Sequence, residues 1–195
     1  MRTRLLVAAA AGYLIGCIPV ARTVARRHGV DDLRTVGDRN PGAWNTMELL
    51  GGRAALPVFV GDTAKGAIAA AAGLAAAPGV WWAPYATGGA AMAGHAFPVT
   101  DGCRGGRSVL AFVGVGLVAA PRPAAIAVAI AGATLVTTRR LDVAARVGVF
   151  GFPLVQMVSE GPRRTAATGV LMSFVGLRFA QATIGAAPGD GDPAT

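Results

Sequence analysis

The sequence carries few charged residues. Only 14% of its 195 residues are Asp, Glu, Lys or Arg, whereas a soluble domain carries about 25%. Hydrophobic residues make up 53% of the chain, and the mean hydropathy is +0.53. So little charge excludes an ordinary soluble domain. It indicates an integral membrane protein with roughly five to seven crossings of about 20 residues each.

Cysteine and histidine are also scarce, with two residues of each type: Cys17, Cys103, His28 and His95. Two distant cysteines do not form a disulfide framework or a metal site. The chain also lacks the P-loop and the Gly-x-Ser-x-Gly nucleophile motif. We therefore expect neither a metal nor a cofactor, and no nucleophile of the hydrolase type.

Lysine is nearly absent, although the net charge is +8, because every basic residue except Lys65 is arginine. A basic excess can indicate nucleic-acid binding. Here the arginines are spread over short loops without the interleaved aromatic residues that stack on bases. Positive loops orient membrane proteins. We therefore expect membrane lipid, and no nucleic acid, as a partner.

Seven apolar runs divide the chain, at about 5–21, 54–77, 80–99, 108–120, 123–137, 147–159 and 165–187. In lipid such runs must be helices, because the backbone finds no other hydrogen-bond partner. The sequence predicts one all-α transmembrane domain over 1–187 with about seven short helices, or five if the shortest runs do not cross. Residues 188–195 are predicted to be a disordered tail. Small residues at 69–77 and 88–94 predict close helix packing.

The arginines predict the orientation. With seven spans and the N-terminus outside, eleven arginines fall in inside loops and five in outside segments, as the positive-inside rule requires. This arrangement places the two polar loops, 31–45 and 100–107, on the same cytoplasmic face.

The first polar loop combines flexibility with hydrogen-bond donors. Gly37 and Gly42 can expose backbone N–H groups, Asn40 and Asn45 add amide donors, and Arg34 adds charge. Such a loop can bind a phosphate, although a plain turn between helices would have a similar composition.

Three further features lie in or beside apolar runs. Asp62 and Lys65, spaced i and i+3, share one helix face, and charges at membrane depth are functional or form a structural pair. His95 ends a run just before the Arg-Gly-Gly-Arg segment at 104–107. That segment is a second candidate anion-binding loop before a helix N-terminus.

Five motifs stand in a fixed order. They are Gly16-Cys17-Ile18-Pro19, Asp32-Leu33-Arg34 with Gly37 to Asn45, Asp62-Thr63-Ala64-Lys65-Gly66, Gly94-His95-Ala96-Phe97-Pro98-Val99, and Gly105-Gly106-Arg107. In order and spacing they resemble the motifs of the bacterial acyl-phosphate:glycerol-3-phosphate acyltransferase family. The resemblance covers roughly residues 12–110. Beyond that it rests mainly on hydropathy.

The resemblance implies a small polytopic enzyme of the bacterial inner membrane whose site faces the cytoplasm. Such an enzyme transfers a fatty acyl group from acyl phosphate to the 1-hydroxyl of glycerol 3-phosphate, which yields lysophosphatidic acid and phosphate for phospholipid synthesis. Because acyl phosphate is already activated, catalysis can rely on positioning and charge stabilisation.

The resemblance also implies roles for individual residues. Catalytic roles fall on Asn40, Lys65, His95 and Arg107. Substrate or phosphate binding falls on Arg34, Gly37, Asp38, Gly42, Asn45, Gly105, Gly106 and Arg178, with the Gly105 and Gly106 amides facing the acyl phosphate.

Several positions depart from the family pattern. Asp38 stands where the family has Ser, Arg39 where it has Gly, Trp44 where it has Thr, Glu48 where it has Arg, and Arg107 where it has Lys. Carboxylates at 38 and 48 would repel phosphate. Two alternatives therefore remain: a non-catalytic membrane protein that binds phosphate or lipid, and an enzyme with a different acceptor.

Overall fold

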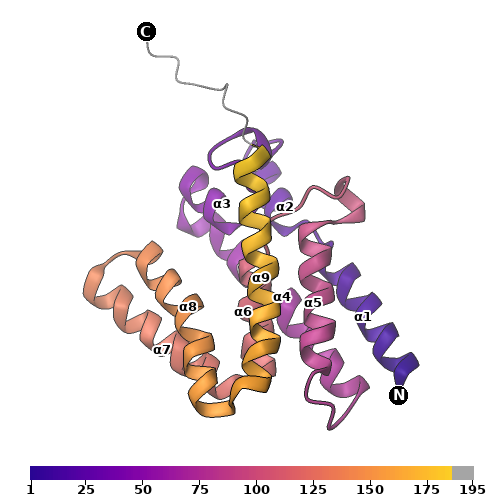
Figure 1. Cartoon of the computed structure of the whole chain (residues 1–195). Coiled ribbons are helices and arrows are strands. Elements are labelled where there is room, and N and C mark those ends of the chain that lie inside the picture. Colours follow the sequence, from indigo (N-terminus) through magenta and orange to yellow (C-terminus); the bar gives the residue numbers. More distant parts are fainter. Residues whose placement is uncertain (186–195) are drawn as a thin grey trace.

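The computed structural model describes residues 1–185, and over this range the chain is helical with no β-strand (Figure 1). The α-helices are α1 (Arg2–Gly16), α2 (Val20–Arg27), α3 (Ala43–Leu50), α4 (Gly52–Ala76), α5 (Ala83–Ala96), α6 (Val109–Ala119), α7 (Pro121–Thr138), α8 (Leu141–Glu160) and α9 (Pro162–Gly185). Two 3₁₀ turns, Leu33–Thr35 and Val99–Asp101, lie in the polar loops. The tail expected at 188–195 lies outside the described residues.

Each of the seven predicted apolar runs contains a helix. Among the described residues, four stretches are long and apolar enough to cross a membrane: 2–27, which joins α1 and α2, then α4, α7 and α8. Helix α6 is apolar but shorter. The all-helical membrane class is therefore confirmed, while the number of seven crossings stays a prediction.

Helices α2 and α3 were not predicted, because they lie in the polar stretch between the first two apolar runs. Helix α2 is amphipathic: it buries Ala21, Val24 and Ala25 and ends on Arg26 and Arg27. Its apolar face joins a small core with Leu33, Ala43 and Val58. A pattern of only two helical turns is too short to be distinguished from a loop in the sequence.

Small residues allow the main helices to approach closely, as predicted. A Cβ at Gly66 of α4 would overlap the Ala111 carbonyl of α6, and one at Gly16 of α1 would overlap the Ala91 carbonyl of α5. Without a side chain at these glycines the backbones make direct van der Waals contact. The predicted packing faces at 69–77 and 88–94 are confirmed by the burial of Ala69, Gly88 and their neighbours.

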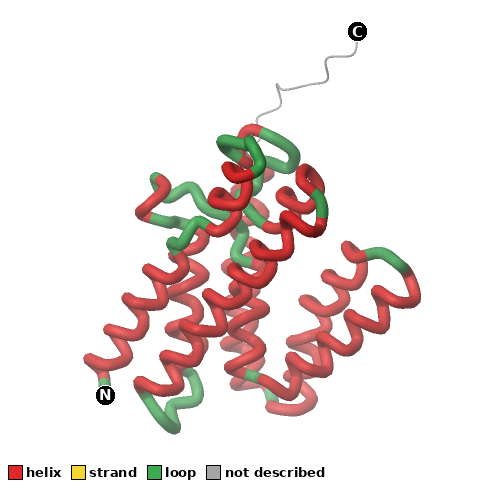
Figure 2. The backbone as a smooth tube through the Cα atoms, turned by 180° about the vertical axis from the view of Figure 1, so that it is seen from behind, coloured by secondary structure: helices red, strands yellow, loops and turns green. Residues whose placement is uncertain are grey.

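The two polar loops lie at the same end of the bundle, opposite the N-terminus (Figures 1 and 2). At the other end, Gln156 of α8 donates to the Tyr85 hydroxyl of α5 at 2.8 Å and accepts from Thr168 of α9. This buried network joins three helices. The connecting turn of the α7–α8 hairpin splays away from the other helices (Figure 1), while its opposite end packs in the core through Ala124 and Phe152.

Candidate active site

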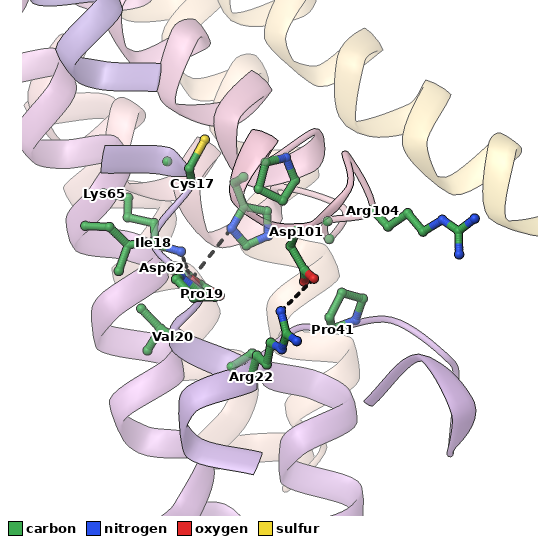
Figure 3. Close-up of a pocket in the computed structure, with 16 residues that line it drawn as sticks. Cys17, Ile18, Pro19, Val20, Arg22, Pro41, Asp62, Lys65, Asp101 and Arg104 are labelled. Atoms are coloured by element: carbon green, nitrogen blue, oxygen red, sulfur yellow. Dashed lines mark hydrogen bonds and ion pairs between the residues drawn. The ribbon is translucent and has the colours of Figure 1, made fainter. Parts of the chain in front are cut away.

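A small cleft, partly open to solvent, lies between the two polar loops and the helices α1, α4 and α5 (Figure 3). The break between α1 and α2, where Pro19 cannot donate a backbone hydrogen bond, forms one wall. The wall segments are residues 16–22 and 104–106, and the individual side chains are Pro41, Asp62, Lys65, His95, Pro98 and Asp101. The cleft thus combines parts of all five sequence motifs.

Asp62, Lys65 and His95 meet at the cleft, away from bulk solvent. Lys65 Nζ donates to Asp62 Oδ1 at 2.7 Å, and His95 Nδ1 lies 3.6 Å from the same oxygen. The exposed fraction of the side chain is 2% for Asp62, 5% for Lys65 and 9% for His95. The i, i+3 spacing on α4 creates the pair, as predicted, whereas the proximity of His95 follows from the packing of α5 against α4.

Asp101 links the two polar loops to α2. Its carboxylate accepts from Arg22 at 2.7 Å and lies 3.4 Å from Arg34 NH1. Arg34 also donates to the Arg104 carbonyl at 3.2 Å and forks onto Asp32 through Nε and NH2. Arg34 therefore holds its own loop against the second loop.

The Asp32 carboxylate is perturbed by this fork. Hydrogen bonds from the Arg34 side chain, and its charge, hold the pKa of Asp32 below the ordinary value, outweighing the opposing effect of partial burial. Asp32 also caps the 3₁₀ turn by accepting from the Arg34 backbone N–H at 2.9 Å.

Asn45 shapes the first loop from within. Its amide donates to the carbonyls of Leu33 and Val36, both at 3.0 Å, and its carbonyl accepts from the Asp38 N–H at 3.2 Å. Asn45 is fully buried in the first turn of α3. Gly37 is required beside it, because its φ is +59° and a Cβ there would overlap the Asn45 oxygen. In the structure, Asn45 and Gly37 therefore set the conformation of the loop.

The second loop folds back onto the end of α5. The Gly105 and Gly106 N–H groups donate to the carbonyls of Ala96 and His95, at 3.0 and 3.1 Å. This corrects the expectation that these two amides face a phosphate: they are engaged by the helix end. A Cβ at Gly106 would lie 2.5 Å from His95 Nε2, so glycine at this position lets the His95 ring reach the cleft wall.

Arg178 of α9 braces the same loop from the other side. It donates to the carbonyls of Gly105 at 3.1 Å and Gly106 at 3.4 Å, and its guanidinium lies 4.5 Å from the Phe97 ring centroid. Phe97 follows His95 closely in the chain. Arg178 thereby holds one side of the cleft.

Arg107 joins the second loop to the first. Its NH1 donates to Asp38 Oδ2 at 2.9 Å, while Asp38 Oδ1 accepts from the Asn40 N–H at 3.0 Å. The Arg107 guanidinium also stacks on Phe179, at 4.6 Å. Two departures from the family pattern, Asp38 and Arg107, thus contact each other.

Two other departures form a second pair. The Trp44 indole N–H donates to Glu48 Oε1 at 2.7 Å along one face of α3. Glu48 is exposed and is not part of the cleft wall. Its carboxylate is therefore oriented along α3.

The predicted residues therefore fall into three groups. Lys65, His95, Gly105 and Gly106 line the cleft; Arg34, Asp38, Arg107 and Arg178 connect the loops around it; and Gly37, Asn40, Gly42 and Asn45 build the first loop. Sequence reasoning did not select Arg22 or Asp101. The signal available for Asp101 was its position as the only acid in the loop 100–107.

Comparison with known proteins gives one consistent result. A family model described as glycerol-3-phosphate acyltransferase matches residues 6–184. A glycerol-3-phosphate acyltransferase of Bordetella avium is 36% identical over 150 residues, which is 76% of this chain and 71% of that protein. One from Agrobacterium fabrum is 34% identical over 173 residues, covering 88% of this chain and 82% of that protein.

The glycerol-3-phosphate acyltransferase 5 of Dehalococcoides mccartyi is 41% identical over 127 residues. The match covers 63% of this chain and about half, 52%, of the length of that relative. Among solved structures, the crystal structure of PlsY (YgiH), an integral membrane glycerol 3-phosphate acyltransferase in its glycerol 3-phosphate form, superimposes with a TM-score of 0.79 and 27% identity, covering 92% of this chain and 90% of that one. The lysophosphatidic acid form gives a TM-score of 0.77 at 26% identity.

Proposed function

The chain belongs to the glycerol-3-phosphate acyltransferase family, and we propose that it transfers a fatty acyl group from acyl phosphate to the 1-hydroxyl of glycerol 3-phosphate. The products are lysophosphatidic acid and inorganic phosphate. The observation that carries this proposal is the convergence of both polar loops on one cleft that contains Lys65 and His95.

The charges around the cleft support two phosphate-bearing substrates. Lys65, Arg22 and Arg104 belong to the cleft wall. Arg107 ends the second loop, and Arg178 contacts it from α9. In a site partly closed to water, such cations stabilise anions more strongly than they do in bulk solvent. The side chain of Asn40 in the first loop receives one phosphate, because the backbone N–H groups of residues 38–40 and 42 already donate within that loop. Arg107 receives the acyl phosphate.

The chemistry requires no covalent intermediate on the protein. The 1-hydroxyl of the acceptor attacks the acyl carbon, the bond to the phosphate oxygen breaks, and phosphate leaves with the electron pair. A substrate phosphate can take the hydroxyl proton. The protein then contributes alignment and charge stabilisation, with His95, supported by Asp62, orienting a substrate at the cleft wall.

The proposed setting is the bacterial plasma membrane with the cleft facing the cytoplasm. The loop end of the bundle lies opposite the N-terminus, and the excess of arginine in the loops at that end supports its placement inside. Soluble glycerol 3-phosphate would then reach the cleft from the cytoplasm, and the acyl chain would remain in the lipid.

The test is an assay of the purified protein in liposomes with acyl phosphate and glycerol 3-phosphate, measuring lysophosphatidic acid. We expect product from the wild type, a loss of at least tenfold in R107Q, and no loss in R146Q, since Arg146 is 73% exposed on α8. Glycerol as the acceptor tests the alternative of a phosphate-free acceptor. Folded protein that makes no product with glycerol 3-phosphate would refute the proposed reaction.

A further inference from the structure

Arg107 and Asp38 form an ion pair in the structure at the position where the proposed function places the acyl phosphate. Arg107 NH1 and Asp38 Oδ2 are 2.9 Å apart, and the two side chains are 21% and 27% exposed. The pair is therefore accessible to water and to a small anion. A carboxylate paired with a guanidinium occupies the same donors that a phosphate oxygen would use.

The pairing leaves Arg107 incompletely satisfied. Asp38 contacts the guanidinium through one oxygen, because the other accepts from the Asn40 N–H. Arg107 Nε is buried and has no hydrogen-bond partner within residues 1–185. A buried donor without an acceptor is costly, and Asp38 satisfies only one nitrogen of the guanidinium, NH1.

The local charge also favours an added anion. Arg178 lies beside Arg107, since it binds the Gly106 carbonyl next to Arg107 in the chain. Within residues 1–185 its hydrogen bonds go to neutral oxygens, those of Gly105, Gly106 and Gln181. Of these two guanidinium groups, only that of Arg107 is paired with a carboxylate within residues 1–185, so the positive charge of Arg178 adds to the attraction for an anion.

We infer that the Asp38 carboxylate competes with phosphate ligands for Arg107. This inference deepens the proposed function and rests on it. A phosphate binds by displacing the Asp38 carboxylate from Arg107, while Asp38 keeps its hydrogen bond to the Asn40 N–H. Asp38 therefore weakens phosphate binding without blocking it, and neutralising Asp38 tightens it.

The test measures the binding of inorganic phosphate, without any turnover, to the purified full chain in detergent, by thermal shift at constant ionic strength. D38N removes an ion pair that phosphate must otherwise displace, and it removes a negative charge near the bound phosphate. A partly exposed ion pair contributes little, so we expect D38N to lower the dissociation constant for phosphate by about threefold to tenfold. D142N is the matched control, since Asp142 is also paired with an arginine, Arg140, but on α8. D142N should leave the dissociation constant unchanged.

A double-mutant cycle identifies the partner. In R107Q, phosphate binding should weaken, and adding D38N to R107Q should tighten it by less than twofold. Three results would each overturn the inference. They are an unchanged or weaker phosphate affinity in D38N, an equal gain from D38N with and without Arg107, and no phosphate binding by either wild type or D38N. Tighter phosphate binding in D38N without acyl transfer by either protein would support the inference and refute the proposed reaction instead.

Discussion

The Lys65 ammonium lies 2.7 Å from the Asp62 carboxylate, and the two side chains are only 5% and 2% exposed. This is the only lysine in the chain, and it is paired within its own helix at the edge of the cleft. His95 Nδ1 approaches the same carboxylate oxygen from α5. Asp62 therefore joins a helix-internal pair to the residue that faces the second loop.

Removing one member of this pair should destabilise the protein strongly. K65M leaves a buried carboxylate without its partner, and such changes cost about 3–5 kcal/mol. We expect a large fall in the melting temperature of K65M in detergent, followed by tryptophan fluorescence. The double variant D62N/K65M removes the unpaired charge and should recover part of the loss. A double variant less stable than K65M would contradict this account of the pair.

The first loop should depend on the amide of Asn45. N45D has the same shape, but a carboxylate oxygen replaces the amide nitrogen that donates to the Leu33 and Val36 carbonyls. That oxygen then faces two carbonyl oxygens. We expect a loss of about 2 kcal/mol or more in stability, together with at least tenfold lower acyl transfer. T46S is the control, because it keeps the hydroxyl that donates to the Gly42 carbonyl. Equal activities for N45D and T46S would show that the loop does not need the amide.

Glu48 should matter little to catalysis, although the sequence suggested that its charge opposes phosphate. It is exposed and hydrogen-bonded to Trp44, and it is not part of the cleft wall. E48Q keeps an acceptor for the indole and should change kcat/KM by less than about twofold, as surface substitutions do. In the combined variant D38S/E48R, any gain should come from position 38, which the two single variants will separate.

The Asp32–Arg34 fork predicts an acid-dependent part of stability. Because the folded-state pKa of Asp32 is lowered, its contribution is present above the unfolded pKa of about 3.9 and is lost as the pH falls through the lower folded-state value. The melting temperature of D32N should therefore lie below that of wild type by a similar margin at pH 7 and pH 5. The margin should shrink at pH 3. A margin that widens with acid would contradict the assignment.

Several site residues could be predicted because their roles are local. Asp62 and Lys65 pair within one helix turn. Gly37 has a left-handed backbone conformation, which glycine adopts more readily than other residues. Asp101 could not be selected in this way. Its partners Arg22 and Arg34 are more than 60 residues away in the chain, and no spacing rule connects them.

The hydrogen-bond partners of the backbone amides in the second loop could not be predicted either. Gly105 and Gly106 in a polar loop suggested free N–H groups, but the end of α5 supplies carbonyls that bind them. Likewise, the sequence suggested that the carboxylates of Asp38 and Glu48 would both repel a phosphate. The structure separates them: one pairs with Arg107 and the other lies along α3 beside Trp44.

Hydropathy and short-range spacing act within one segment of chain, so the membrane class, the approximate positions of seven apolar helices and the family motifs could be predicted from the sequence. Which charges meet depends instead on how the helices pack. Helix packing through small residues brings α5 against α4 and folds the second loop over the first. The contacts of His95 with Asp62 and of Arg107 with Asp38 depend on that packing, because their partners lie on segments far apart in the chain.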